Sequence, residues 1–198
     1  MLATSLILAS GSPRRRDLLS RLKVPFATVP AEIAERARPG ERPRELAERL
    51  AREKAEAVAA QIGRTPRRVV LGSDTIVVIG DEVLGKPRDP EHAIALLRKL
   101  VGRTHLVMTG VALVESDTGF TRSRVVESRV TLRKADEAEL RDYVATGESL
   151  DKAGAYAVQG AGRRFITAIE GSETNVIGLP LEETLAMLED AGVEIPGR

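Results

Sequence analysis

Apolar and polar positions along the chain follow two periods, one typical of strands and one typical of helices. Apolar runs predict strands over residues 6–9, 24–29, 69–79, 83–84, 105–114 and 123–132. Apolar residues at helical spacing, or segments with helix start signals, predict helices over residues 13–22, 43–62, 90–100, 136–146 and 180–191. Helices therefore mix with strands over the whole length of the chain.

Two further segments complete the pattern. The apolar runs at residues 165–169 and 175–177 predict a hairpin that turns at Glu170-Gly171-Ser172. The polar stretch at residues 30–43 carries three prolines and Gly40 and is expected to be a loop. No repeat or long linker divides the chain, so residues 1–198 are expected to form a single domain. Because parallel and hairpin-connected strands both occur, we expect an α/β fold. Its mixed twisted sheet would be flanked by helices, in two lobes with a central cleft.

Composition narrows the class of protein. The chain has 198 residues, of which 42% are hydrophobic and 30% charged, as in folded globular proteins. No apolar run is long enough to span a membrane, and the N-terminus lacks the features of a secretory signal. We therefore expect a cytoplasmic protein without a membrane partner. A net charge of +1 and 3% aromatic residues offer little to a nucleic acid, which is not expected as a partner.

The residues that bind metals are few. The chain has no cysteine and only two histidines, His92 and His105, which argues against a protein zinc site. Carboxylates remain as possible ligands for a hard cation. His105, at the start of a predicted strand, is expected to be a structural histidine.

A possible phosphate cradle follows the first strand. Ser12 is in a position to cap the next helix with its hydroxyl, and Pro13 occupies the first helical position. The helix N-terminus and the adjacent Arg14 and Arg15 together favour a phosphate site. From these residues alone, a solvated surface helix start is an equally weighted alternative. The segment is not a Walker A loop, because it lacks the glycine and lysine spacing of that motif.

Asp74 is the second candidate. A carboxylate inside an apolar strand is costly unless it is paired, protonated or bound to a cation. Asp74 is therefore a candidate metal ligand or a base that activates water, with a structural aspartate at a strand end as the alternative. Lys86 lies between Gly85 and Pro87 in a tight turn. Gln159 follows an apolar run, where an amide either braces a turn or reads a base edge.

The order of these motifs resembles that of the Maf family, the nucleoside triphosphate pyrophosphatases associated with septum formation. The resemblance extends from Leu6 to the last helix. It is carried by residues 10–15 (SGSPRR), 73–75 (SDT), 85–87 (GKP), 105–111 (HLVMTGV), 151–160 (DKAGAYAVQG) and 178–181 (GLPL).

The resemblance implies a function and a set of site residues. The family hydrolyses a nucleoside triphosphate to the monophosphate and pyrophosphate with magnesium or manganese. It has a fold like that of inosine triphosphate pyrophosphatases and is expected to form homodimers. By this resemblance Asp74 is the catalytic residue, and Asp74 and Glu35 are the metal ligands. Ala34 replaces one acid of the family's D-I-D-E pattern, which leaves one carboxylate fewer for the metal. The phosphate-binding residues correspond to Ser12, Arg15, Lys54 and Lys86.

Three further positions indicate the substrate. Arg14, Thr75 and Gln159 resemble the dTTP/UTP branch of the family, and an amide suits the mixed donor and acceptor edge of uracil or thymine. The sequence thus predicts a dTTP and UTP pyrophosphatase. The alternatives are a 7-methyl-GTP or broad non-standard nucleotide pyrophosphatase, and a nucleotide-binding regulator of septum formation without turnover. Asp74 favours an enzyme, because a regulator that only binds nucleotide does not need it.

Overall fold

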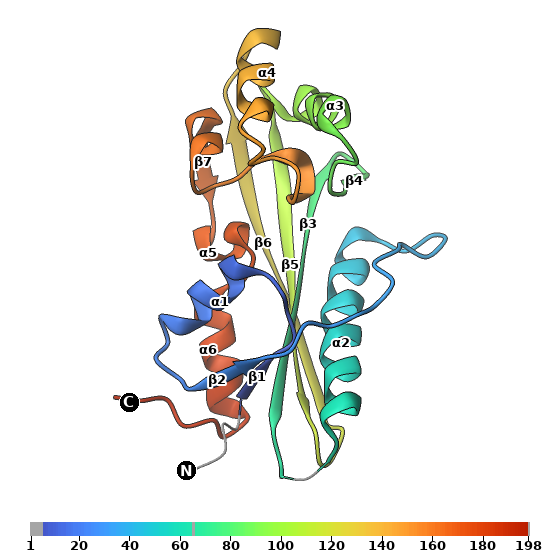
Figure 1. Cartoon of the computed structure of the whole chain (residues 1–198), viewed down its shortest axis with the longest axis vertical. Coiled ribbons are helices and arrows are strands. Elements are labelled where there is room, and N and C mark those ends of the chain that lie inside the picture. Colours follow the sequence, from blue (N-terminus) through green and yellow to red (C-terminus); the bar gives the residue numbers. More distant parts are fainter. Residues whose placement is uncertain (1–5, 65, 198) are drawn as a thin grey trace. The chain divides into compact units, whose positions relative to one another are not determined.

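A computed structural model describes residues 6–64 and 66–197 of the chain. Within these residues the strands form a seven-stranded sheet in the order β2-β1-β3-β5-β6-β7, with β4 paired to β3 (Figure 1). Their bounds are β1 Leu6–Leu8, β2 Phe26–Thr28, β3 Val69–Ile79, β4 Glu82–Leu84, β5 Thr104–Glu115, β6 Thr121–Leu132 and β7 Ile166–Glu170. β1 pairs in parallel with β2 and β3, whereas β4 and β7 pair antiparallel with β3 and β6. The predicted mixed α/β sheet is confirmed.

Several helices begin at prolines that the sequence marks as helix starts. Pro13, Pro43 and Pro90 each occupy an early position of their helix, where a missing N–H costs nothing. Asp89 accepts a hydrogen bond from the His92 backbone N–H at 2.7 Å and so caps its helix. The bounds are α1 Pro13–Ser20, α2 Pro43–Ile62, α3 Pro90–Leu100, α4 Glu137–Ala145, α5 Glu173–Ile177 and α6 Leu181–Asp190, with short 3-10 turns at Ala153–Ala155 and Ala161–Phe165. No helix of the described residues is long and apolar enough to cross a membrane.

The described residues divide into two compact units. Unit 1 contains the residues up to Asp74, then Thr109–Val126, and the residues from Gly178 onward. Unit 2 contains Thr75–Met108 and Glu127–Ile177. Strands β3, β5 and β6 each contribute residues to both units. The predicted single domain and the predicted cleft stay predictions.

In unit 1, helix α2 packs closely on the sheet. Ala47, Ala51 and Ala55 are completely buried on the sheet-facing side of the helix. Opposite them are glycines: a Cβ atom on Gly72 of β3 would collide with the Ala51 carbonyl oxygen, and one on Gly110 of β5 with that of Ala47. The helix backbone therefore lies almost directly on the strand backbones, which only small residues permit.

In unit 2, an apolar core forms around α3 and α4. Tyr143 and Phe165 are fully buried, and their rings meet edge to face at 5.4 Å between centroids. Gly154 has a positive φ of 70° and fits against Val77 and Leu100. The motif at residues 151–160 is therefore anchored in this core.

The predicted hairpin after residue 165 is wrong. β7 ends at Glu170, but the segment beyond it is helix α5, Glu173–Ile177. Ser172 accepts a hydrogen bond from the Asn175 backbone N–H at 3.1 Å, as a helix cap does. Asn175 is fully buried, and its amide donates to the Val107 carbonyl at 3.1 Å and to Ser128 Oγ at 2.9 Å. The short apolar run was ambiguous between strand and helix, and the cap decides for the helix.

Candidate functional site

Asp74 lies inside β3 and is 6% exposed. Its Oδ1 accepts a hydrogen bond from Lys54 Nζ at 2.6 Å. Lys54 comes from the middle of α2 and is also 6% exposed. The expectation that a carboxylate in this strand needs a partner is confirmed, and the partner is a buried ammonium group.

The same ammonium group binds a second carboxylate. Lys54 Nζ lies 2.5 Å from Oε1 of Glu35, in the segment between β2 and α2. The Glu35 side chain is 42% exposed, so this carboxylate faces both Lys54 and solvent. Lys54 therefore brings together the two residues that the sequence predicted as metal ligands, one buried and one accessible.

The close approach of α2 to the sheet makes this contact possible. Gly72 comes two residues before Asp74 in β3, and a Cβ there would lie 2.9 Å from the Ala55 backbone nitrogen. Ala55 follows Lys54 in the helix. Because no side chain separates the two backbones, the side chain of Lys54 reaches Asp74 directly.

Arg15 of α1 adds a second cation to the site. Its Nε donates to the Gly178 carbonyl at 2.9 Å, and Nη1 donates to Ser10 Oγ at 3.4 Å. Burial lowers the pKa of Arg15 from its ordinary value, and the charges of Asp74 and Glu35 act in the opposite direction. The guanidinium is thus close enough to both carboxylates to sense their charge.

Ser12 differs from its predicted role. It stands at the N-cap of α1 with extended backbone, but its side chain makes no capping hydrogen bond. Instead its backbone N–H donates to Ser10 Oγ at 3.2 Å, the oxygen that also accepts from Arg15. The predicted hydroxyl cap is therefore wrong, because Ser10 organises this turn.

The other predicted site residues are distributed over the two units. Arg14, in α1 of unit 1, is half-buried, as is Thr75, which follows Asp74 in β3 and is the first residue of unit 2. Lys86 and Gln159 are exposed in unit 2. Lys86 lies in the turn after β4, and Gln159 lies between the two 3-10 turns.

A backbone contact connects the segments of Lys86 and Gln159. The Gly154 N–H donates to the carbonyl of Gly85 at 3.1 Å. Gly85 directly precedes Lys86, and Gly154 lies in the motif that ends with Gln159 and Gly160. Within unit 2 the predicted phosphate-binding turn and the predicted base-reading segment are therefore tied together.

The carboxylates of Glu35 and Asp74 fit a hard divalent cation. Magnesium is commonly bound by one or two protein carboxylates, and the substrate phosphates and water supply the other oxygens. No group of three or more His, Cys, Asp or Glu side chains is placed to hold a metal within residues 6–64 and 66–197. Glu35 and Asp74, which both contact Lys54, correspond to the one or two protein carboxylates that commonly bind magnesium.

Sequence reasoning missed two groups that build the site, the Gly178 carbonyl and the Ser10 hydroxyl. Ser73 Oγ and Arg15 Nε both donate to the Gly178 carbonyl, at 3.0 Å and 2.9 Å. A carbonyl group leaves no signal in a sequence, although Gly178 begins a recognised motif. Ser10 carried a signal, since it opens the Ser-Gly-Ser-Pro turn and its hydroxyl can accept.

The comparisons with known proteins agree with these motifs. The family model described as Maf-like protein matches residues 5–191. The chain belongs to this family. The Maf-like match covers every predicted site residue from Ser12 to Gln159, so the resemblance stated from the sequence is confirmed.

Relatives of this Maf-like chain are similar over almost their full length. A protein of Myxococcus xanthus (strain DK1622) is 50% identical over 98% of this chain and 96% of its own length. One from Anaeromyxobacter dehalogenans (strain 2CP-C) is 49% identical over 98% of both chains. One from Escherichia coli O157:H7 is 49% identical over 94% of this chain and 93% of its own. All three are named dTTP/UTP pyrophosphatase.

A solved structure of the Staphylococcus aureus Ham1 protein is similar at a greater distance. It is 14% identical, has a TM-score of 0.48, and is matched over 94% of this chain and 98% of its own. This likeness is too weak to add to the family assignment.

Proposed function

We propose that this chain hydrolyses dTTP and UTP to the nucleoside monophosphate and pyrophosphate. The observation that carries the proposal is the buried Lys54–Asp74 pair, with Glu35 on the same ammonium and Arg15 close by. The name shared by relatives that are about half identical supports the choice of substrate.

The cations and the start of α1 would bind the triphosphate. Arg15 presents a planar guanidinium and Lys54 an ammonium, and both are favourable partners for phosphate oxygens. Ser12 would contribute its hydroxyl, and the N-terminus of α1 adds the partial positive charge of the helix dipole. Lys86 would bind a further phosphate group from its exposed turn.

Asp74 would direct the attacking water. Its Oδ1 is held by Lys54, so the carboxylate has a defined orientation. The water oxygen attacks the α-phosphorus, and the bond from that phosphorus to the bridging oxygen breaks. Pyrophosphate leaves with the bond's electron pair, and Asp74 orients the water or accepts its proton.

Glu35 and Asp74 would hold a magnesium or manganese ion. When bound, such an ion neutralises charge on the phosphate oxygens. The base would be read by Arg14, Thr75 and Gln159, with the Gln159 amide offering both a donor and an acceptor.

The direct test is pyrophosphate release from a panel of nucleoside triphosphates with magnesium. The panel includes dTTP, UTP, dCTP, GTP and 7-methyl-GTP, and we expect release from dTTP and UTP to dominate. Preferred turnover of 7-methyl-GTP would contradict the proposed substrate. Tight binding of nucleotide without any release would instead indicate a regulator.

Asp74→Asn tests the catalytic role. Because the amide cannot accept the water's proton, we expect kcat to fall by about 10³-fold, within the usual range for loss of a general base. Asp81→Asn, in an exposed turn of the same sheet, is the matched control and should retain normal turnover. Near-normal activity of a folded Asp74→Asn protein would contradict the assignment.

We also propose that the chain forms a homodimer, as its resemblance to the family implies. Light scattering on the purified protein measures this directly. A mass of one chain at micromolar concentration would contradict it.

A further inference from the structure

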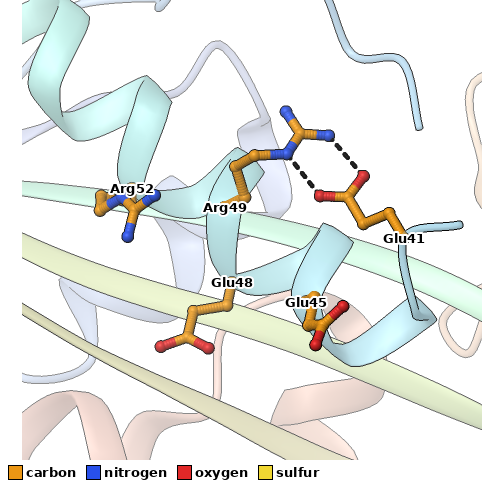
Figure 2. Close-up of a pocket in the computed structure, with 5 residues that line it drawn as sticks. All are labelled: Glu41, Glu45, Glu48, Arg49 and Arg52. Atoms are coloured by element: carbon orange, nitrogen blue, oxygen red, sulfur yellow. Dashed lines mark hydrogen bonds and ion pairs between the residues drawn. The ribbon is translucent and has the colours of Figure 1, made fainter. Parts of the chain in front are cut away.

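Arg49 is a buried arginine on the helix that carries Lys54. It is 7% exposed, and its guanidinium faces the carboxylate of Glu41 (Figure 2). Nε lies 2.5 Å from Oε1 of Glu41, and Nη2 lies 2.7 Å from Oε2. This is a two-pronged ion pair, the strongest geometry that arginine and a carboxylate can form.

The same guanidinium reaches the two chain neighbours of the candidate site. Nη2 also donates to the Arg36 carbonyl at 2.9 Å, and Arg36 directly follows Glu35. Nη1 donates to Glu53 Oε2 at 2.9 Å, and Glu53 directly precedes Lys54. One side chain therefore connects the residue after Glu35 with the residue before Lys54.

The segment that carries Glu35 lies outside the regular secondary structure. Residues 29–42 form no helix or strand. Two further contacts join it to the same residues: the Arg38 N–H donates to Glu41 Oε2 and Arg38 Nη2 to Glu53 Oε1, both at 2.9 Å. We call Arg36, Arg38, Glu41, Arg49 and Glu53 the loop clamp.

The buried Arg49–Glu41 pair of the loop clamp borders a hollow on the surface of α2. A hollow of about 260 Å³ is lined by Glu41, Glu45, Glu48, Arg49 and Arg52 (Figure 2). Glu45 pairs with the exposed Arg42 and Glu48 accepts from Ser123, whereas the Arg49–Glu41 pair is buried. The hydrogen bonds from Arg49 lower the pKa of Glu41 to about 2. Glu41 is thus charged throughout the neutral pH range.

We propose that Arg49 and Glu41 are positioning residues, which hold the loop on α2 so that Glu35 meets Lys54. The contact between Glu35 and Lys54 is observed in the structure. The effect of this contact on turnover rests on the proposed function. Neither Arg49 nor Glu41 touches the substrate in this proposal. They act only through Glu35.

The first test needs no substrate. Glu41→Gln removes the charge at nearly constant size, and Glu45→Gln makes the same change on the neighbouring exposed pair with Arg42. In Glu41→Gln we expect amide hydrogen exchange over residues 31–38 to become at least about tenfold faster. Acylation of the Lys54 amine, read by mass spectrometry, should rise to the level seen in Glu35→Gln. Glu45→Gln should change neither. An unchanged Lys54 reactivity in Glu41→Gln would overturn the proposal.

The second test measures coupling to turnover by a double-mutant cycle. We expect Glu41→Gln to lower kcat for dTTP about tenfold, with KM changed by less than about twofold. If Glu41 acts through Glu35, then Glu41→Gln costs nothing further in the Glu35→Gln background. Losses that multiply in the double variant indicate a general structural effect and would overturn the proposal.

Arg49→Lys is a second variant of the same ion pair. It keeps the positive charge at residue 49. A lysine cannot bind Glu41 with two prongs and reach the Arg36 carbonyl at once, so it should behave like Glu41→Gln in both tests. If the native protein turns over no nucleotide, the proposed function is wrong. The positioning role of the loop clamp is then still tested by amide hydrogen exchange over residues 31–38 and by acylation of Lys54. Native-like exchange and Lys54 reactivity in a folded Arg49→Lys protein would overturn it.

Discussion

At the scale of single residues, the candidate site is a balanced set of charges. Arg15 and Lys54 carry two positive charges, and Glu35 and Asp74 carry two negative ones. Burying a charge costs several kcal/mol unless an opposite charge compensates it, and here the two signs cancel. A triphosphate would bring several further negative charges. Neutralising them needs additional cations, which is the part proposed for Lys86 and a divalent ion.

His105 shows a different solution for a buried polar group. It is 3% exposed, and its Nε2 lies 2.7 Å from the Tyr156 hydroxyl. Its Nδ1 is buried without a hydrogen-bond partner among the described residues. The expectation of a structural histidine agrees with this position, but only one of the two ring nitrogens is satisfied.

This burial predicts a dependence of stability on pH. Desolvation lowers the pKa of His105 to about 4, below the ordinary value of 6.5. Between these two values His105 is protonated in the unfolded state but neutral in the folded state. The free energy of unfolding therefore falls as pH drops from 6.5 towards 4. Since one pKa unit corresponds to about 1.4 kcal/mol, we expect a loss of about 2 kcal/mol between pH 6.5 and 5.

Urea unfolding at several pH values measures this loss. His105→Gln should flatten the profile over that interval, although it also lowers stability at pH 7. His92→Gln, at the start of α3, is the matched control. An equally steep profile in His105→Gln would show that other groups cause the acid sensitivity.

At the scale of elements, the contact of α2 with β3 and β5 is decisive. Leu46, Leu50 and Val58 lie at helical spacing in α2, and all three are buried. The small residues on the same helix matter more, because they permit the approach that joins Lys54 to Asp74. Their pairing with Gly72 and Gly110 was not visible from helical periodicity.

Gly72→Ala tests the importance of this approach. The added Cβ would collide with the backbone of α2, which cannot move as a flexible side chain would. We expect a loss of about 2 to 3 kcal/mol in stability, typical of overpacking, and a larger relative loss of turnover. Gly85→Ala is the control for stability and should stay within about 0.5 kcal/mol, since a Cβ there meets nothing within 4 Å. Native stability of Gly72→Ala would contradict the packing argument.

At the scale of the whole molecule, two compact units share strands. β3, β5 and β6 each contribute residues to both units, so the two units are joined by continuous strands. We therefore expect one cooperative unfolding transition, in agreement with the predicted single domain.

Two probes can separate the units. The chain has no tryptophan and two tyrosines, Tyr143 and Tyr156, and both belong to unit 2. Tyrosine fluorescence therefore follows unit 2, whereas far-ultraviolet circular dichroism follows both. Coincident urea midpoints are expected. Midpoints that differ beyond error would show that the units unfold independently.

The sequence alone determined the class of fold, the starts of several helices and the family. Prolines and capping residues act through the local backbone, and the helices predicted over residues 13–22, 90–100 and 136–146 are present in the structure. The need of Asp74 for a partner also followed from local chemistry, because a carboxylate in an apolar strand is costly. The resemblance pointed to Lys54 and Glu35, but not to their contact.

Only the tertiary structure decided which residues meet. Lys54 and Asp74 are 20 positions apart, Arg15 and Gly178 are 163 apart, and neither spacing leaves a periodic signal. The burial of Arg49 is also tertiary, because an arginine on a charged helix is indistinguishable in sequence from its solvated neighbours. Propensity and periodicity act between residues close in the chain. The charge pairs of the site depend on backbone approaches that Gly72 and Gly110 permit across the fold.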